Sequence, residues 1–104
     1  MPNIKLSYLY RDAANYKEFG YTIFKGSIKI DLTQFNALIQ SKLIDGTWFY
    51  ASQWQLPDLH FNSWSDETDH TFHEFESLEY TNAPPNTLIN LAEFKAIVEH
   101  TNWT

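Results

Sequence analysis

The stretch Ile4-Lys5-Leu6-Ser7-Tyr8-Leu9-Tyr10, near the N-terminus, decides the fold. Apolar or aromatic residues occupy positions 4, 6, 8 and 10, whereas the positions between them hold a lysine, a serine and a leucine. Successive side chains of a β-strand point to opposite faces of a sheet, so this alternation predicts a strand with one apolar face. Such a strand requires a partner strand and a covering layer, and the rest of the chain must supply both.

Further segments have the composition of strands. Residues 19–25 are rich in aromatic and β-branched side chains and follow closely enough to return as a hairpin. Short apolar runs at 48–51 and 59–61, separated by Pro57, are also predicted to be strands, as is a longer segment at 71–80. We therefore expect a mostly antiparallel sheet.

Two segments carry helix signals. Residues 31–43 begin with Asp31, a good N-cap, and continue with apolar side chains at a spacing of 3.6 residues. Residues 90–100 begin with Asn90, and Glu93 follows at the position of a capping-box partner. These two helices can supply the covering layer.

The order of these elements is β-β-α-β-β-β-α, which predicts an α+β fold with two helices packed on one face of the sheet. A length of 104 residues fits a single domain spanning residues 1–104. Cysteine is absent, so the fold depends on packing without disulfides. The N-terminus lacks the apolar run of a signal peptide, and no segment has the ~20 apolar residues of a membrane span. We therefore expect a cytoplasmic protein with no membrane partner.

Charge is distributed unevenly along the chain. Residues 1–52 carry six basic and four acidic side chains, a balance of +2, whereas residues 53–104 carry Lys95 against nine acids, a balance of −8. Phosphates require cations, so we do not expect the second half to bind nucleic acid. It is suited instead to a partner protein with a basic surface, to a metal ion, or to solubility alone.

The chain is richest in acids and histidines between residues 66 and 79. Carboxylates and imidazoles together can bind divalent metals, so Asp69, His70 and His73 are candidate metal ligands. No cofactor other than a divalent metal is indicated. The alternatives are a solvated acidic edge strand, whose charges prevent edge-to-edge pairing, and a surface that binds a partner.

A strand over residues 71–80 would divide these side chains between two faces. One face would carry His73, Phe75 and Glu79, and the other would carry Phe72, Glu74 and Glu76. Only part of the set could then converge on a metal ion. Glu74 and Glu76 would remain candidate binding residues for a partner.

Aromatic residues are concentrated in the same half of the chain. Between residues 48 and 80 they are Trp48, Phe49, Tyr50, Trp54, Phe61, Trp64, Phe72, Phe75 and Tyr80. Most residues of this kind are expected in the core. Trp54 and Trp64 have polar neighbours, and the alternative is that one of them stays partly exposed as an interface anchor.

Three further residues are candidates for binding or catalysis. Arg11 and Asp12 lie in the predicted loop after the first strand and can form an ion pair with each other. Alternatively, Arg11 is the protein's only arginine and so its only bidentate anion-binding side chain. His60 lies between two apolar residues, which favours a structural, hydrogen-bonded histidine over a catalytic one.

Three segments resemble a set of small, uncharacterised bacterial proteins of about this size. The segments are YLYRDAANYKEFG at 8–20, LPDLHF at 56–61 and DHTFHEFE at 69–76, and the likeness covers most of the chain. The resemblance implies a bacterial cytosolic protein and carries no known activity or catalytic residues. It directs attention to the loop after the first strand and to the segment of acids and histidines.

Several enzyme signatures are missing from the sequence, including a Gly-rich phosphate loop, a G-x-S-x-G elbow, an H-E-x-x-H helix and a cysteine nucleophile. We therefore favour a non-enzymatic protein-interaction or regulatory module whose acidic, aromatic-rich second half meets a basic partner. One alternative is a metal-dependent enzyme of the hydrolase type that uses residues 66–76. The other is a homo-oligomer in which the basic half of one copy meets the acidic half of a second copy.

Overall fold

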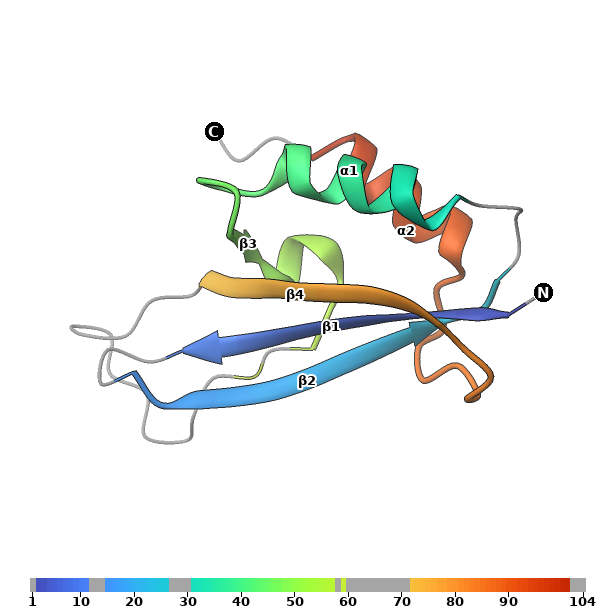
Figure 1. The fold of residues 1–104 in the computed structure, drawn as a ribbon, viewed down its shortest axis with the longest axis horizontal. Coiled ribbons are helices and arrows are strands. Elements are labelled where there is room, and N and C mark those ends of the chain that lie inside the picture. Colours follow the sequence, from blue (N-terminus) through green and yellow to red (C-terminus); the bar gives the residue numbers. More distant parts are fainter. Residues whose placement is uncertain (1, 12–14, 27–30, 58, 60–71, 102–104) are drawn as a thin grey trace.

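The computed structural model describes residues 2–11, 15–26, 31–57, 59 and 72–101. Within these residues, four β-strands form one antiparallel sheet, accompanied by two α-helices and a short 3-10 helix (Figure 1). The elements are β1 (Asn3–Arg11), β2 (Lys17–Phe24), α1 (Leu32–Lys42), β3 (Trp48–Tyr50), η1 (Ala51–Trp54), β4 (Phe72–Thr81) and α2 (Leu91–Glu99). The chain therefore has the predicted α+β architecture with an antiparallel sheet.

The strands lie in the order β2-β1-β4-β3. The predicted hairpin is present, because β1 pairs with β2 from Ile4 opposite Phe24 to Arg11 opposite Lys17. β4 pairs with the other side of β1, although it follows much later in the sequence. This long-range pairing places β1 inside the sheet, with β2 on one side and β4 on the other.

The middle of the chain departs from the predicted order. β3 ends at Tyr50, one residue earlier than expected, and the chain then leaves the sheet to form η1. The predicted strand at 59–61 lies largely outside the described residues, and Leu59 itself belongs to no strand.

The apolar face of β1 holds the core. Ile4, Leu6 and Tyr8 are buried in one cluster with residues of both helices. Figure 1 shows α1 and α2 side by side over the same face of the sheet. Phe94 of α2 joins the layers, because its ring stacks on Phe24 of β2 with the ring centroids 4.3 Å apart.

Both helices begin at the predicted caps. The Asp31 side chain accepts hydrogen bonds from the backbone N–H groups of Thr33 and Gln34. Asn90 and Glu93 form a complete capping box, in which each side chain accepts the backbone N–H of the other residue. Among the described residues, neither helix is long and apolar enough to cross a membrane.

β4 contains one β-bulge. Ser7 of β1 pairs with Ser77, but the next residue, Tyr8, pairs with Phe75. Glu76 is therefore an additional residue on β4 with no counterpart on β1.

The bulge changes which side chains of β4 share a face. Lys5 and Tyr8 lie on opposite faces of β1, so their partners Glu79 and Phe75 lie on opposite faces of β4. The sequence-based placement of Glu79 on the face of His73 and Phe75 is therefore wrong, because regular alternation takes no account of an inserted residue.

The loop before α2 covers the outer edge of β2 near the end of that strand. The Asn86 side-chain oxygen accepts the backbone N–H of Ile23 at 2.7 Å, and the Asn86 backbone N–H donates to the Ile23 carbonyl at 3.1 Å. The Asn86 amide nitrogen also donates to the Tyr21 carbonyl at 3.4 Å. Asn86 thus satisfies edge groups that a neighbouring strand would otherwise pair with.

Candidate functional site

Trp54 lies in the core. Its side chain has 0% exposure, its ring stacks on Phe49 with centroids 4.8 Å apart, and its Nε1 donates to Oγ1 of Thr101 at 2.8 Å. It is therefore not the partly exposed anchor, and the core alternative is correct for this residue. Ser52 and Gln53 are exposed, because η1 turns the tryptophan inward while its polar neighbours face solvent.

His73 is buried on the core side of β4, with 2% exposure. The rings of Tyr8, Tyr10 and Phe49 surround it at centroid distances of 5.8, 5.2 and 6.1 Å. Its Nε2 accepts a hydrogen bond from the backbone N–H of Leu59 at 3.0 Å. This lone pair is engaged by the backbone, so Nε2 is not available to a metal ion in this arrangement.

The other candidate metal ligands, Asp69 and His70, lie outside the described residues, as do Asp12, His60 and Trp64. The metal site therefore stays a prediction. Within the described part of the chain, no three histidine, aspartate or glutamate side chains are grouped so that they could hold a metal ion.

Arg11 forms an ion pair with Glu74 on the neighbouring strand β4. Arg11 Nε lies 2.8 Å from Glu74 Oε2, Nη2 lies 3.3 Å from Oε1, and Nη1 contacts the side-chain oxygen of Asn15. The hydrogen bond to Glu74 raises the pKa of Arg11 above its usual value. The guanidinium already has a bidentate internal anion, so it is less suited to binding an external one than the sequence suggested.

An aromatic hollow of about 360 Å³ adjoins this ion pair. It is lined by Arg11, Trp48, Phe72 and Glu74, and the two aromatic rings have centroids 6.3 Å apart. The charged side chains that line it are paired with each other. The hollow therefore offers apolar walls to a ligand, whereas its two charged groups are already paired.

β3 pairs with only part of the outer edge of β4. β3 covers it from Phe72 to Glu74, and the backbone N–H of Phe75 donates to the Thr47 carbonyl at 3.2 Å. In the part of the chain that the structure describes, no strand pairs with residues 76–79 on that side. An edge of this kind presents peptide groups to which another strand can add.

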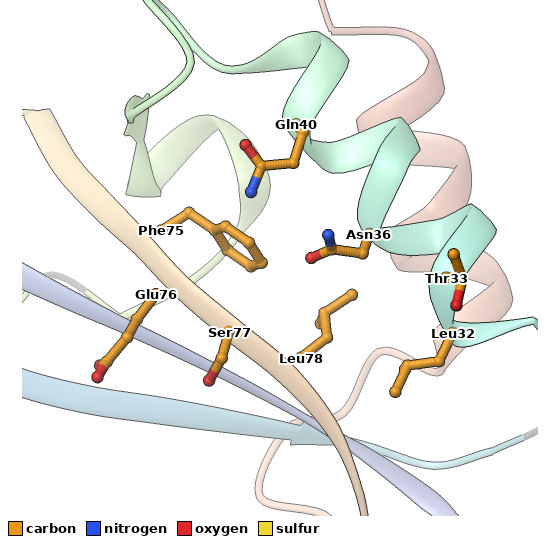
Figure 2. Close-up of a pocket in the computed structure, with 8 residues that line it drawn as sticks. All are labelled: Leu32, Thr33, Asn36, Gln40, Phe75, Glu76, Ser77 and Leu78. Carbon is orange, nitrogen blue, oxygen red and sulfur yellow. The ribbon is translucent and has the colours of Figure 1, made fainter.

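A groove of about 380 Å³ lies between this edge and α1 (Figure 2). The residues that line it are Leu32, Thr33, Asn36 and Gln40 of α1 and Phe75, Glu76, Ser77 and Leu78 of β4. We call this feature the edge groove. It combines a covering helix with a strand edge that β3 covers only in part.

The side chains of the edge groove divide by direction (Figure 2). Phe75 and Leu78 point from β4 toward α1, and Asn36 and Gln40 point from α1 into the space between the two elements. Glu76 points away from α1. The groove therefore has an apolar and amide-lined interior and a carboxylate on its outer side.

Glu76 is a candidate binding residue in the sequence, whereas the contribution of α1 was not predicted. Thr33, Asn36 and Gln40 recur at intervals of three and four residues, beside the buried stripe that includes Phe35 and Ile39. This polar stripe was the available signal, because side chains at that spacing share one side of a helix.

Amides, hydroxyls, apolar side chains and one carboxylate line the edge groove. These groups provide hydrogen bonds, apolar contacts and a negative charge, which suit the binding of an extended chain. No family model matches the protein, and neither a curated protein nor a solved structure matches it.

Proposed function

We propose that the protein is a non-enzymatic protein-interaction module that binds a basic partner at the edge groove. The observation that carries the proposal is the edge of β4 at residues 76–79, which no described strand covers and which runs beside a groove under α1. Recognition at an exposed sheet edge uses main-chain hydrogen bonds for affinity and neighbouring side chains for specificity.

Charge on β4 favours a basic partner. Glu76 and Glu79 are exposed, and the sequence contains no lysine or arginine between Lys42 and Lys95. Lys5 lies 3.7 Å from Glu79, but both side chains are partly exposed, so solvent screens this contact. A lysine or arginine of a partner could approach these exposed carboxylates, and the attraction between opposite charges would increase the association rate and specificity.

The apolar anchor of this interface is not Trp54, which the sequence suggested as one of two candidates. Trp54 is buried, whereas Leu32, Phe75 and Leu78 are half-buried and line the edge groove. Partial exposure leaves apolar surface that a partner side chain can cover, which contributes roughly 25 cal/mol for each Å² removed from water.

The test begins with capture of binding proteins from a cell lysate at low ionic strength. Each captured protein is identified by mass spectrometry, purified and titrated against the pure chain by calorimetry. We expect a basic partner whose binding is lost when Glu76→Lys and Glu79→Lys are combined. Binding should also weaken as salt increases above about 0.1 M, where exposed charges are screened beyond ~10 Å.

The matched control combines Glu18→Lys with Glu99→Lys. It makes the same change in net charge on β2 and α2, outside the edge groove. The control should keep the interaction. Equal loss of binding in both double variants would mean that net charge alone drives association, and the proposed interface would be wrong.

A further inference from the structure

We infer that the occupant of the edge groove is an extended segment of the partner, which adds to the sheet as a fifth strand beside β4 and alternates apolar with basic residues. The inference rests on the proposed function and specifies the chemistry of the partner. Three observations carry it: the position of β3, the directions of the groove side chains and the distribution of charge.

β3 marks the line that an added strand would follow. This strand already occupies the outer side of β4 up to Glu74, and the Thr47 carbonyl extends the pairing to Phe75. An added segment beside residues 76–79 would continue along the line that β3 begins. It would bond to peptide groups of β4 that no described strand covers, in the manner of β-strand addition.

The interior of the edge groove selects apolar side chains. Alternate residues of an added strand would point toward α1, where they meet Leu32, Phe75 and Leu78 (Figure 2). Asn36 and Gln40 of α1 project into the same space and carry both amide donors and carbonyl acceptors. These amides can bond to the far edge of the added strand.

The outer face selects basic side chains. The remaining residues of the added strand would point to the face opposite α1, where Glu76 points (Figure 2). Glu79 lies on that face too, because it pairs with Lys5 on the side of β1 away from the core. Cross-strand pairs of opposite charge are favourable, so lysine or arginine is expected at these alternate positions.

The same charges disfavour a second copy of this chain as the occupant. Pairing two β4 edges about a two-fold axis would bring the Glu76 and Glu79 carboxylates of both copies side by side. Like charges in neighbouring strands are destabilising. The charge pattern therefore favours a basic segment from another protein over edge-to-edge dimerisation.

The probe is a fluorescein-labelled peptide in which lysine and valine alternate over seven residues, titrated into the full chain by fluorescence anisotropy. A peptide with glutamate in place of lysine is the charge control. We expect the lysine peptide to bind at least about tenfold more tightly than the glutamate peptide. Glu76 and Glu79 attract lysine side chains and repel glutamate side chains. Combining Glu76→Lys with Glu79→Lys should reverse the preference, and Glu18→Lys with Glu99→Lys should keep it.

Backbone pairing is tested with two N-methylated forms of the lysine peptide, one methylated at every lysine and one at every valine. The amides of alternate residues lie on one edge of a strand, so at least one form must lose binding if the peptide adds to β4. Bound lysine peptide should also slow hydrogen exchange at amides of residues 76–79, measured by NMR.

The outcomes separate the two proposals. If both N-methylated forms bind as tightly as the parent peptide, strand addition is wrong and the proposed function stands as a charge-based interaction. If the lysine peptide fails to bind but a purified protein partner is lost in the Glu76→Lys and Glu79→Lys variant, the inferred segment chemistry is wrong. If the Glu76→Lys and Glu79→Lys variant changes the binding of neither the lysine peptide nor a protein partner, both proposals are wrong.

Discussion

His73 connects β4 to the segment that follows η1. Its Nε2 accepts the backbone N–H of Leu59 at 3.0 Å, while its ring lies among Tyr8, Tyr10 and Phe49. A polar atom in such surroundings is stable only when it is hydrogen-bonded. At the scale of single residues, His73 therefore acts as a structural link and not as a surface group.

Replacing His73 by phenylalanine tests this link. Phenylalanine retains an aromatic ring but provides no acceptor for the Leu59 N–H, so the free energy of unfolding should fall by about 1–3 kcal/mol. Urea denaturation measures the change. Leucine at the same position lacks both the acceptor and the aromatic ring and should lose more stability than phenylalanine. Equal stability of the phenylalanine variant and the natural protein would contradict the structural importance of the bond.

At the scale of elements, the outer edges of β2 and β4 differ in how they are covered. Asn86 covers the end of the β2 edge with hydrogen bonds to Ile23 and Tyr21. The β4 edge at residues 76–79 has no equivalent cover among the described residues and carries a bulge at Glu76. Bulges and charges are common at sheet edges because they limit edge-to-edge aggregation. On β4 the charges still allow a segment of opposite charge to pair with the edge.

The cover on β2 can be removed by Asn86→Ala. The substitution removes the side-chain acceptor of the Ile23 N–H at a position that water can reach, so the free energy of unfolding should fall by about 0.5–1.5 kcal/mol. Hydrogen exchange at the Ile23 amide should also become faster, as NMR would show. Asn82→Ala, at an exposed position of the same connection, is the control and should leave both quantities nearly unchanged. Unchanged exchange at Ile23 in the Asn86 variant would contradict the proposed cover.

At the scale of the whole molecule, charge asymmetry bears on self-association. The second half carries Lys95 against nine acids, and two of these acids, Glu76 and Glu79, lie along the β4 edge at residues 76–79. We expect the pure protein to be a monomer at both low and high salt, because a symmetric pairing of β4 edges brings like charges together. Light scattering measures this directly. A dimer at low salt that dissociates at high salt would support the homo-oligomer alternative and contradict the preferred partner.

The sequence by itself determined the local elements of this protein. The alternation at positions 4–10 marked β1, and Asp31 and Asn90 marked the starts of the two helices. These features depend on side-chain periodicity and capping, which are properties of neighbouring residues. The uneven charge was also readable directly, because it requires no knowledge of the fold.

Only the tertiary structure decided which of these residues share a surface. The pairing of β1 with β4 joins segments far apart in the chain, and its bulge at Glu76 moves Glu79 to the face opposite Phe75. Burial of Trp54 likewise depends on how η1 packs against α2 and not on the polar residues beside the tryptophan. The edge groove arises where α1 passes beside a strand that β3 covers only in part. Long-range pairing and packing set these relations, and local periodicity does not encode them.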